Sequence, residues 1–183
     1  MGDDEESGGS GSVLWIGSER ANRLPGEWSG IAIGAVKAAM DPAALKEAGV
    51  THVVNAGAFA YERHPDVRYL DIDVQDCLDS NLHEHFGNTN CFLSRAAGEG
   101  GLTLVHCAAG RSRSPTLVAA YLIEQGDMTA DEAVEMVSAA RPIAQPNPSF
   151  HMQLMDFRKD IVNGRNANSD DGSDELWGGG GGR

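Results

Sequence analysis

Short hydrophobic runs and helical repeats alternate along the chain. The short runs are apolar or rich in β-branched residues and predict strands at residues 31–34, 50–55, 67–74 and 102–106, with a further apolar piece at residues 13–16. Residues 67–74 alternate with a period of two. Residues 102–106 are apolar throughout, which is typical of a central strand that is buried on both faces.

Helical repeats occupy much of the remaining sequence. Asp41-Pro42 is a good start for a helix over residues 43–48, and Gly49 is placed to end it. Further helices are expected over residues 82–97, from Pro115, from residue 130 to Arg141-Pro142, and from Asn147-Pro148 onward, although the residues GNTN at 87–90 weaken the first of these. We predict an α/β fold, with a central, mostly parallel sheet of about five strands flanked by helices.

The two ends of the chain differ in composition from its middle. Residues 1–12 and 165–183 are acidic, rich in Gly, Ser and Asn, and almost free of apolar residues. Such segments bury too little apolar surface to offset the entropy cost of ordering. We therefore expect two disordered acidic tails around one folded domain at residues 13–164.

The charge balance limits the partners of the domain. The formal net charge is −13, of which the two tails carry −4 and −2, leaving −7 on residues 13–164. An acidic domain disfavours nucleic acid and anionic membranes as partners, and no segment has the length and hydropathy of a transmembrane helix. Any phosphate-binding pocket must be a local positive region.

The cysteines indicate a reducing compartment. Cys77, Cys91 and Cys107 are an odd number with no signal peptide, which fits a reactive thiol better than a disulfide framework. The Cys and His spacings indicate no metal site. We expect a cytoplasmic protein, with the nucleus as a second compartment, and favour a monomer.

One segment, His106 to Ser114 (HCAAGRSRS), combines several features of a phosphate site. It lies between the buried strand at residues 102–106 and the apolar helix expected from Pro115. A strand that turns through small residues into a helix directs backbone N–H groups and the positive helix end at one point, as a phosphate dianion requires. The residues expected to bind phosphate are Ala108, Ala109, Gly110, Arg111, Ser112 and Arg113.

Cys107 is the predicted nucleophile at the base of this loop. Two guanidinium groups, converging amides and a helix start should lower the pKa of its thiol and yield a thiolate. The planar fork of Arg113 suits two phosphate oxygens. A buried cysteine followed by a solvated loop is the alternative, but His, Cys, Gly, Arg and Ser at these offsets between a strand and a helix favour the functional interpretation.

These residues resemble the His-Cys-x5-Arg-Ser/Thr signature of the protein tyrosine phosphatase superfamily, and in particular its small, atypical dual-specificity branch. Residues 41–55, 76–86, 104–122 and 141–154 also resemble that branch in order and spacing. The resemblance implies a two-step reaction through a phosphocysteine, with no metal and no cofactor. It also implies that Ser114 donates to the sulfur and that His106 is a buried residue supporting the loop rather than a base.

The general acid must come from outside the loop, which contains no carboxylate. The nearest candidates upstream are Asp71, Asp73, Asp76 and Asp79. Asp71 and Asp73 lie within the predicted strand, where solvation or ion pairing is expected, whereas Asp76 follows it on a loop. Dual-specificity relatives carry their acid in the pattern Asp-x4-Asn-Leu/Ile-x3-Phe, which is matched by Asp76, Asn81, Leu82 and Phe86. We predict Asp76 as the acid, with Asp79 as the alternative.

Several roles stay open at this point. Ser114 is also placed to be a simple N-cap before Pro115, and Asn147 either braces the active-site loop, as in the family, or caps the last helix. Arg111 either steers a dianion into an acidic protein or pairs with a surface carboxylate. Cys77, next to the predicted acid, is a candidate for a reversible disulfide with Cys107.

The predicted function is a dual-specificity protein phosphatase acting on phosphotyrosine and phosphoserine/threonine. Its partner would be a phosphorylated protein, such as a kinase. A phosphatase of phosphoinositide, glucan or RNA 5′ phosphate is the alternative, although relatives of the first two kinds often have a Gly before the signature Arg or a Lys in the loop. An inactive phosphate-binding module is less favoured, because such modules usually lose the Cys, the Arg or the acid.

Overall fold

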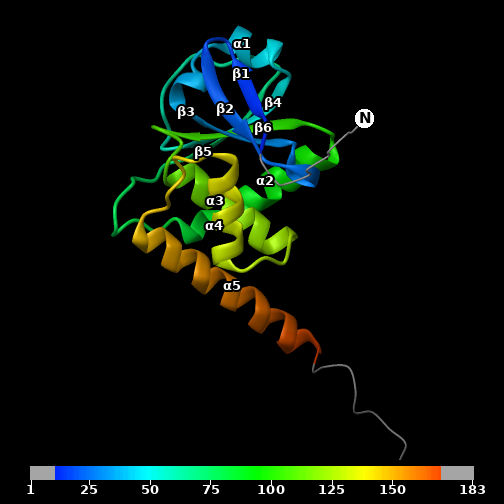
Figure 1. The fold of residues 1–183 in the computed structure, drawn as a ribbon, viewed down its shortest axis with the longest axis vertical. Coiled ribbons are helices and arrows are strands. Elements are labelled where there is room, and N and C mark those ends of the chain that lie inside the picture. The colour runs from blue at the N-terminus through cyan, green and yellow to red at the C-terminus, as the bar shows by residue number, and fades with distance from the viewer. Residues whose placement is uncertain (1–10, 170–183) are drawn as a thin grey trace, which may run out of the picture.

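A six-stranded sheet organises the fold in this computed structural model, which describes residues 11–169 and the side chains of residues 11–165. The strand order is β1-β2-β3-β6-β4-β5 (Figure 1). Strands β3, β6, β4 and β5 are parallel, while β1 and β2 join antiparallel at the β3 edge. The mostly parallel α/β fold is confirmed, with six strands rather than about five. The bounds are β1 Val13–Ile16, β2 Glu19–Arg23, β3 Ile31–Ala35, β4 Val50–Ala56, β5 Arg68–Ile72 and β6 Leu102–Cys107.

Strand β2 was not expected from the sequence, which predicts a loop there. Its residues, ERANR, are mostly polar and show no apolar alternation. The strand forms because Gly17, with a φ of +58°, allows a tight turn from β1. Asn22 then pairs with Ile33 of β3. Pairing with neighbouring strands, rather than local propensity, decides this element.

The helices begin and end close to the expected positions. Their bounds are α1 Pro42–Glu47, α2 Phe86–Gly98, α3 Arg113–Gln125, α4 Ala130–Ala140 and α5 Pro148–Ser169. Asp41 caps α1 by accepting a hydrogen bond from the Ala44 N–H at 2.9 Å, and Thr129 with Glu132 forms the capping box of α4. Helix α3 begins at Arg113, two residues before Pro115, so Arg113 and Ser114 lie in its first turn.

The polar stretch GNTN does not interrupt helix α2. A short 3₁₀ turn at His83–His85 precedes the helix, which then runs through these residues. Thr89 and Asn90 are buried, and the side-chain amide of Asn90 donates to the Glu124 carboxylate of α3 at 2.9 Å. Asn90 therefore belongs to the interface between α2 and α3.

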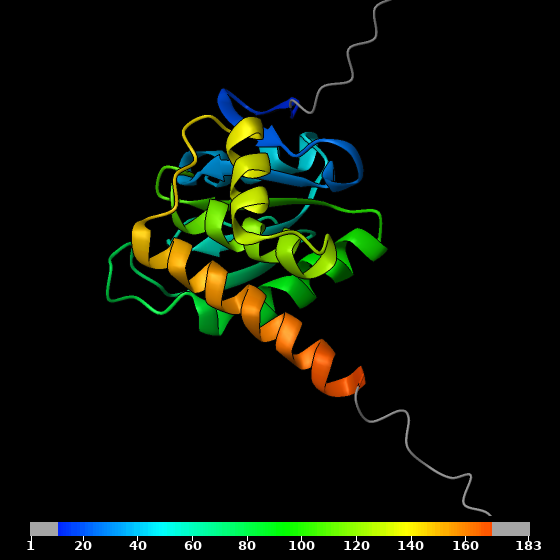
Figure 2. The same cartoon turned by 60° about the horizontal axis from the view of Figure 1, so that its bottom comes forward.

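Helices cover both faces of the sheet. Helices α2 to α5 lie against one face, and α1 with the 3₁₀ turn Val36–Ala39 lies against the other (Figures 1 and 2). All six residues of β6 are buried, as expected for the central strand. Helix α3 lies between the sheet and the pair α4 and α5, which explains its apolar surface.

The outer segments differ in how the structure describes them. Helix α5 extends away from the sheet to Ser169, five residues beyond the boundary expected at Gly164 (Figure 2). At the other end, the Ser12 carbonyl accepts a hydrogen bond from the Arg23 N–H at 2.8 Å. The rest of the two expected tails, residues 1–10 and 170–183, lies outside the described residues. Within residues 11–169, every helix is too short or too polar to cross a bilayer.

The position of α3 leads to a stability prediction. Leu117 is fully buried, so Leu117→Ala should lower the free energy of unfolding by about 2–5 kcal/mol by leaving a cavity. Met40 is 55% exposed, and Met40→Ala should change it by less than about 0.5 kcal/mol. Urea unfolding of both variants measures the difference. Equal effects would contradict the packing of α3.

Candidate active site

The loop at residues 108–112, which we call the phosphate-binding loop after its predicted role, connects the central strand to the most buried helix. Cys107 ends β6 with 2% of its surface exposed, and α3 begins six residues later at Arg113. Between them, Gly110 has a φ of +67°. A Cβ atom there would collide with the Gly34 carbonyl oxygen and lie 2.8 Å from Arg141 Nη2, so only glycine fits.

Arg141 holds the carbonyl groups of this loop. Its Nε donates to the Gly110 carbonyl at 2.7 Å, and its Nη2 donates to the Ala109 carbonyl at 2.9 Å. Since these carbonyls point toward Arg141, the N–H groups of the same loop are free to point the other way, toward Cys107. Arg141 therefore sets the orientation of the loop peptides.

Arg141 is a buried cation whose partners are neutral. Only 6% of its surface is exposed, and its Nη1 donates to the Asn22 side-chain oxygen of β2 at 3.0 Å. Among the described residues it has no carboxylate partner. Burial lowers the pKa of Arg141, and a negative charge on Cys107 acts in the opposite direction. The guanidinium and the thiolate thus stabilise one another.

The Cys107 thiol is held in a state that favours ionisation. Burial alone raises its pKa, but the hydrogen bond from the Ser114 hydroxyl and the N–H groups of Ser114, Arg111 and Gly110 outweigh burial and lower the pKa below its ordinary value. The Ser114 hydroxyl lies 3.3 Å from Sγ. The predicted direction is confirmed, but its main causes are a hydroxyl and backbone amides rather than the guanidinium groups of the loop.

His106 is fully buried beneath the loop. Its Nε2 lies 2.7 Å from the Tyr61 hydroxyl, and the Phe59 ring packs near its imidazole. Burial lowers the pKa of His106 to about 4, so the imidazole is neutral at physiological pH. With its Nε2 engaged by Tyr61, His106 occupies a supporting position, as the resemblance implied.

Arg113 extends from the first turn of α3 over the end of the sheet. Its Nη1 donates to the Val74 carbonyl at 3.1 Å, and its guanidinium lies 5.6 Å from the centre of the Phe59 ring. A Cβ atom at Gly57 would lie 2.6 Å from Nη1, so this glycine leaves room for the guanidinium. The side chain is only 11% exposed, which limits the positions it can adopt.

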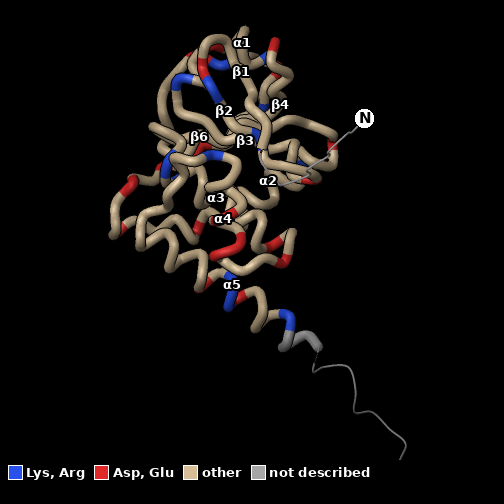
Figure 3. Tube along the Cα trace, viewed as in Figure 1, with Lys and Arg blue, Asp and Glu red and all other residues tan. Residues whose placement is uncertain are grey.

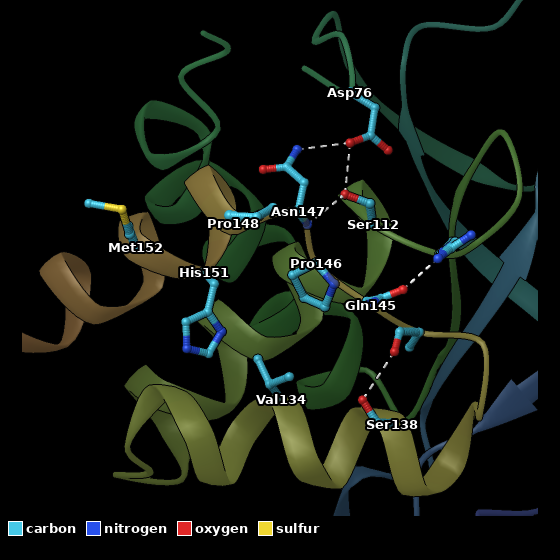
Figure 4. A pocket seen from close by; sticks show the side chains of 12 residues that line it. Asp76, Ser112, Val134, Ser138, Gln145, Pro146, Asn147, Pro148, His151 and Met152 are labelled. Atoms are coloured by element: carbon cyan, nitrogen blue, oxygen red, sulfur yellow. Dashed lines mark hydrogen bonds between the residues drawn. The ribbon is translucent and has the colours of Figure 1, made fainter. Parts of the chain in front are cut away.

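Asp76 lies directly against the phosphate-binding loop. It follows β5, and its Oδ1 accepts hydrogen bonds from the Ser112 hydroxyl at 2.8 Å and from the Asn147 side-chain amide at 2.9 Å (Figure 4). Its Oδ2 lies 3.8 Å from Arg113 Nε. Asp79, the alternative acid, is exposed and makes no hydrogen bond or ion pair with a described residue of the loop. The structure therefore brings Asp76 to the loop, and not Asp79.

Asn147 combines the two roles that the sequence left open. Its side-chain oxygen caps α5 by accepting a hydrogen bond from the Phe150 N–H at 2.9 Å. Its amide binds Asp76, and its backbone N–H donates to the Ser112 hydroxyl at 3.2 Å. Ser114, by contrast, is not the N-cap of α3, because the helix already begins at Arg113.

The remaining candidates lie at the surface around the loop. Arg111 donates to the Gln145 side-chain oxygen, so pairing with a carboxylate is not seen among the described side chains. Cys77 is an exposed free thiol 3.0 Å from the Ser80 hydroxyl, and a disulfide with Cys107 stays a prediction. Asp71 is paired with Arg63 at 2.7 Å, as expected for an acid within the strand.

Sequence reasoning missed Arg141 and Asn22 as parts of this site. The Arg141-Pro142 pair was interpreted only as the end of a helix, which it also is. Asn22 lies in the strand that was not predicted. No local pattern indicates that these two residues, 119 positions apart, would meet beneath the loop.

Comparison with known proteins places this geometry in a family. The model of the dual specificity phosphatase catalytic domain matches residues 31–160. Dual specificity protein phosphatase 1 of Arabidopsis thaliana is 38% identical over 133 residues, which span 72% of this chain and 67% of the relative. The chain belongs to the dual specificity phosphatase family. Asn22 lies before the region that the family model matches.

Other members of the dual specificity phosphatase family agree with this assignment. Dual specificity protein phosphatase 15 of Mus musculus is 36% identical over 142 residues, spanning 78% of this chain and 59% of the relative. The crystal structure of a human DUSP28 variant has a TM-score of 0.72 and 32% identity, and the match covers 79% of this chain and 97% of that one. The DUSP15 crystal structure has a TM-score of 0.71 and 29% identity, covering 85% and 99%.

The hydrogen bond to Cys107 in this dual specificity phosphatase leads to a pH prediction. Ser114→Ala removes the hydroxyl that stabilises the thiolate, so the pKa of Cys107 should rise and the thiolate fraction below that pKa should fall. The midpoint of the iodoacetamide alkylation rate against pH should move upward by about one pH unit. Ser138→Ala is the control, because that hydroxyl bonds the Ala144 carbonyl instead. An unchanged midpoint in Ser114→Ala would contradict the assigned contact.

Proposed function

We propose that this phosphatase hydrolyses phosphotyrosine and phosphoserine/threonine in proteins through a phosphocysteine on Cys107. One observation carries the proposal: backbone amides of the loop converge on the Cys107 thiol and lower its pKa. Asp76 is hydrogen-bonded to the same loop through Ser112. Family membership supports a phosphorylated protein as the partner. The catalytic set is Cys107, Arg113, Asp76 and Ser114.

In the first step, the Cys107 thiolate attacks phosphorus and the bond from phosphorus to the ester oxygen breaks. The phosphoryl oxygens are held by the N–H groups of the loop and by the Arg113 guanidinium, whose fork matches two of them. Asp76 gives its proton to the leaving oxygen. The products are a neutral alcohol or phenol and an S-phosphocysteine.

In the second step, water attacks the phosphocysteine and the sulfur leaves as a thiolate. The Asp76 carboxylate takes a proton from the water, and inorganic phosphate is released. The Ser114 hydroxyl donates to the departing sulfur, so it stabilises the thiolate that each turnover regenerates. Protons and charge balance over the cycle without another co-reactant.

The two oxygens of Asp76 have different surroundings. Oδ1 accepts two hydrogen bonds, from Ser112 and Asn147, which fix the direction of the carboxyl group. Oδ2 accepts no hydrogen bond from a described residue and has only Arg113 Nε at 3.8 Å. We assign the transferred proton to Oδ2, because Oδ1 is occupied by donors in both steps.

The nucleophile is tested by Cys107→Ser, which should hydrolyse phosphotyrosine and phosphothreonine peptides at less than about a thousandth of the wild-type kcat/KM. Cys91→Ser, at an exposed thiol on α2, is the matched control and should keep wild-type turnover. If Cys107→Ser were as fast as wild type, the covalent mechanism would be wrong. Phosphoinositide and phosphoglucan serve as comparison substrates, and faster turnover of either by the wild type would favour a non-protein substrate.

The acid is tested by Asp76→Ala. Loss of the proton donor should slow a phosphothreonine peptide by about 10²–10⁴-fold and an activated aryl phosphate by less, because a good leaving group needs less protonation. Asp79→Ala is the control and should behave as wild type. An acid-dependent limb of the pH–rate profile that persisted in Asp76→Ala but vanished in Asp79→Ala would transfer the role to Asp79.

A further inference from the structure

A groove of about 770 Å³ lies beside the phosphate-binding loop. It lies between α4 and α5, and the loop that joins these helices forms part of its wall (Figure 4). In Figure 4, Asp76 and Ser112 stand at one end, and Val134 and His151 stand at the other. We call this space the α4–α5 groove. The reaction steps proposed above do not use it.

One end of the α4–α5 groove is shared with the active site. Asp76, Arg111 and Ser112 line the groove and also belong to the catalytic machinery or its loop. Some of their polar atoms already have partners: Asp76 Oδ1 accepts from Ser112 and Asn147, and Arg111 Nη2 donates to Gln145. The polar groups that remain, Asp76 Oδ2 and the other N–H groups of Arg111, lie at the end shared with the phosphate site.

The remaining wall of the α4–α5 groove is mainly apolar. Its residues from α4, the connecting loop and α5 include Val134, Ala144, Pro146, Pro148 and Met152. The two prolines have no backbone N–H, so this wall cannot pair with a peptide as a sheet edge does. Met152 is 64% exposed at the rim. Burial of an apolar side chain is the interaction that such a wall supports.

The acidic side chains at the far end of the groove disfavour an acidic ligand there, whereas the cation Arg111 lines the end shared with the phosphate site. At its far end, Asp131 of α4 lies 3.0 Å from His151 Nε2. Asp131 and Glu132 are the acidic residues of the first turn of α4, which Figure 3 shows in red. In a chain with a formal net charge of −13, an acidic side chain placed here meets like charge.

We propose that the α4–α5 groove binds an apolar side chain of the phosphorylated protein substrate, close in sequence to the phosphorylated residue. We choose the substrate as the occupant because the groove is continuous with the phosphate site. Asp76, Arg111 and Ser112 belong to both. The inference rests on the proposed function and adds a substrate preference to it. Selectivity then comes from apolar burial beside the phosphate site, with acidic residues rejected.

Phosphotyrosine peptides with a serine background test this preference. A single Leu, or a single Glu, is moved from about four residues before to about four residues after the phosphotyrosine, a reach of about 13 Å each way for an extended chain. The readout is kcat/KM for each peptide divided by kcat/KM for 4-nitrophenyl phosphate. Leu at one position or two adjacent positions should raise this ratio about tenfold, and Glu at the same positions should lower it.

Two variants of α5 locate the effect. Met152→Glu places a charge on the groove wall and should reduce the gain from Leu to less than about twofold. Met155→Glu makes the same change three residues along the helix, at a residue that is 44% exposed and does not line the groove, and should keep the full gain. A Leu gain that Met152→Glu leaves intact would overturn the proposal.

The outcomes separate this inference from the function on which it rests. If the wild type hydrolyses 4-nitrophenyl phosphate and every peptide with the same relative efficiency, the groove does not select substrates and only this inference fails. If the wild type hydrolyses neither, the proposed function fails and the inference fails with it. A preference for Glu over Leu would also overturn the inference, because the groove would then bind a charged side chain rather than an apolar one.

Discussion

The phosphate-binding loop depends on the direction of its carbonyl groups. Backbone N–H groups converge on an anion only where the carbonyls of the same segment point away from it, and Arg141 holds those of Ala109 and Gly110 in that direction. Because Arg141 is buried without a described carboxylate partner, its charge is not neutralised locally and favours the Cys107 thiolate. One side chain thus shapes the anion site and contributes to its charge.

Three loops meet around this centre and are joined by a few short hydrogen bonds. The Ser112 hydroxyl donates to Asp76 and accepts from the Asn147 N–H, while the Asn147 amide also binds Asp76. Asn147 is at the same time the cap of α5. Because these groups form hydrogen bonds with one another, Asp76, the phosphate-binding loop and the start of α5 form one polar unit.

Local patterns account for most of what could be predicted. The buried strand before Cys107, the Asp41 cap and the capping box at Thr129 depend on residues close together in sequence, and each is confirmed. Strand β2 was missed because its polar residues form a strand only by pairing with β3. The contact between Arg141 and Asn22 was missed for a related reason, since it joins residues 119 positions apart through that same strand.

The activation of Cys107 shows how an acidic protein can hold a thiolate. The main groups that lower the pKa of Cys107 are the Ser114 hydroxyl and nearby N–H groups, whereas Arg113 is turned toward Val74 and Asp76. Hydrogen bonds act over contact distances, while remote surface charges are screened by salt within about 10 Å. Ionisation of Cys107 therefore depends little on the net charge of −13, and Arg113 is left for its proposed contact with the phosphoryl oxygens.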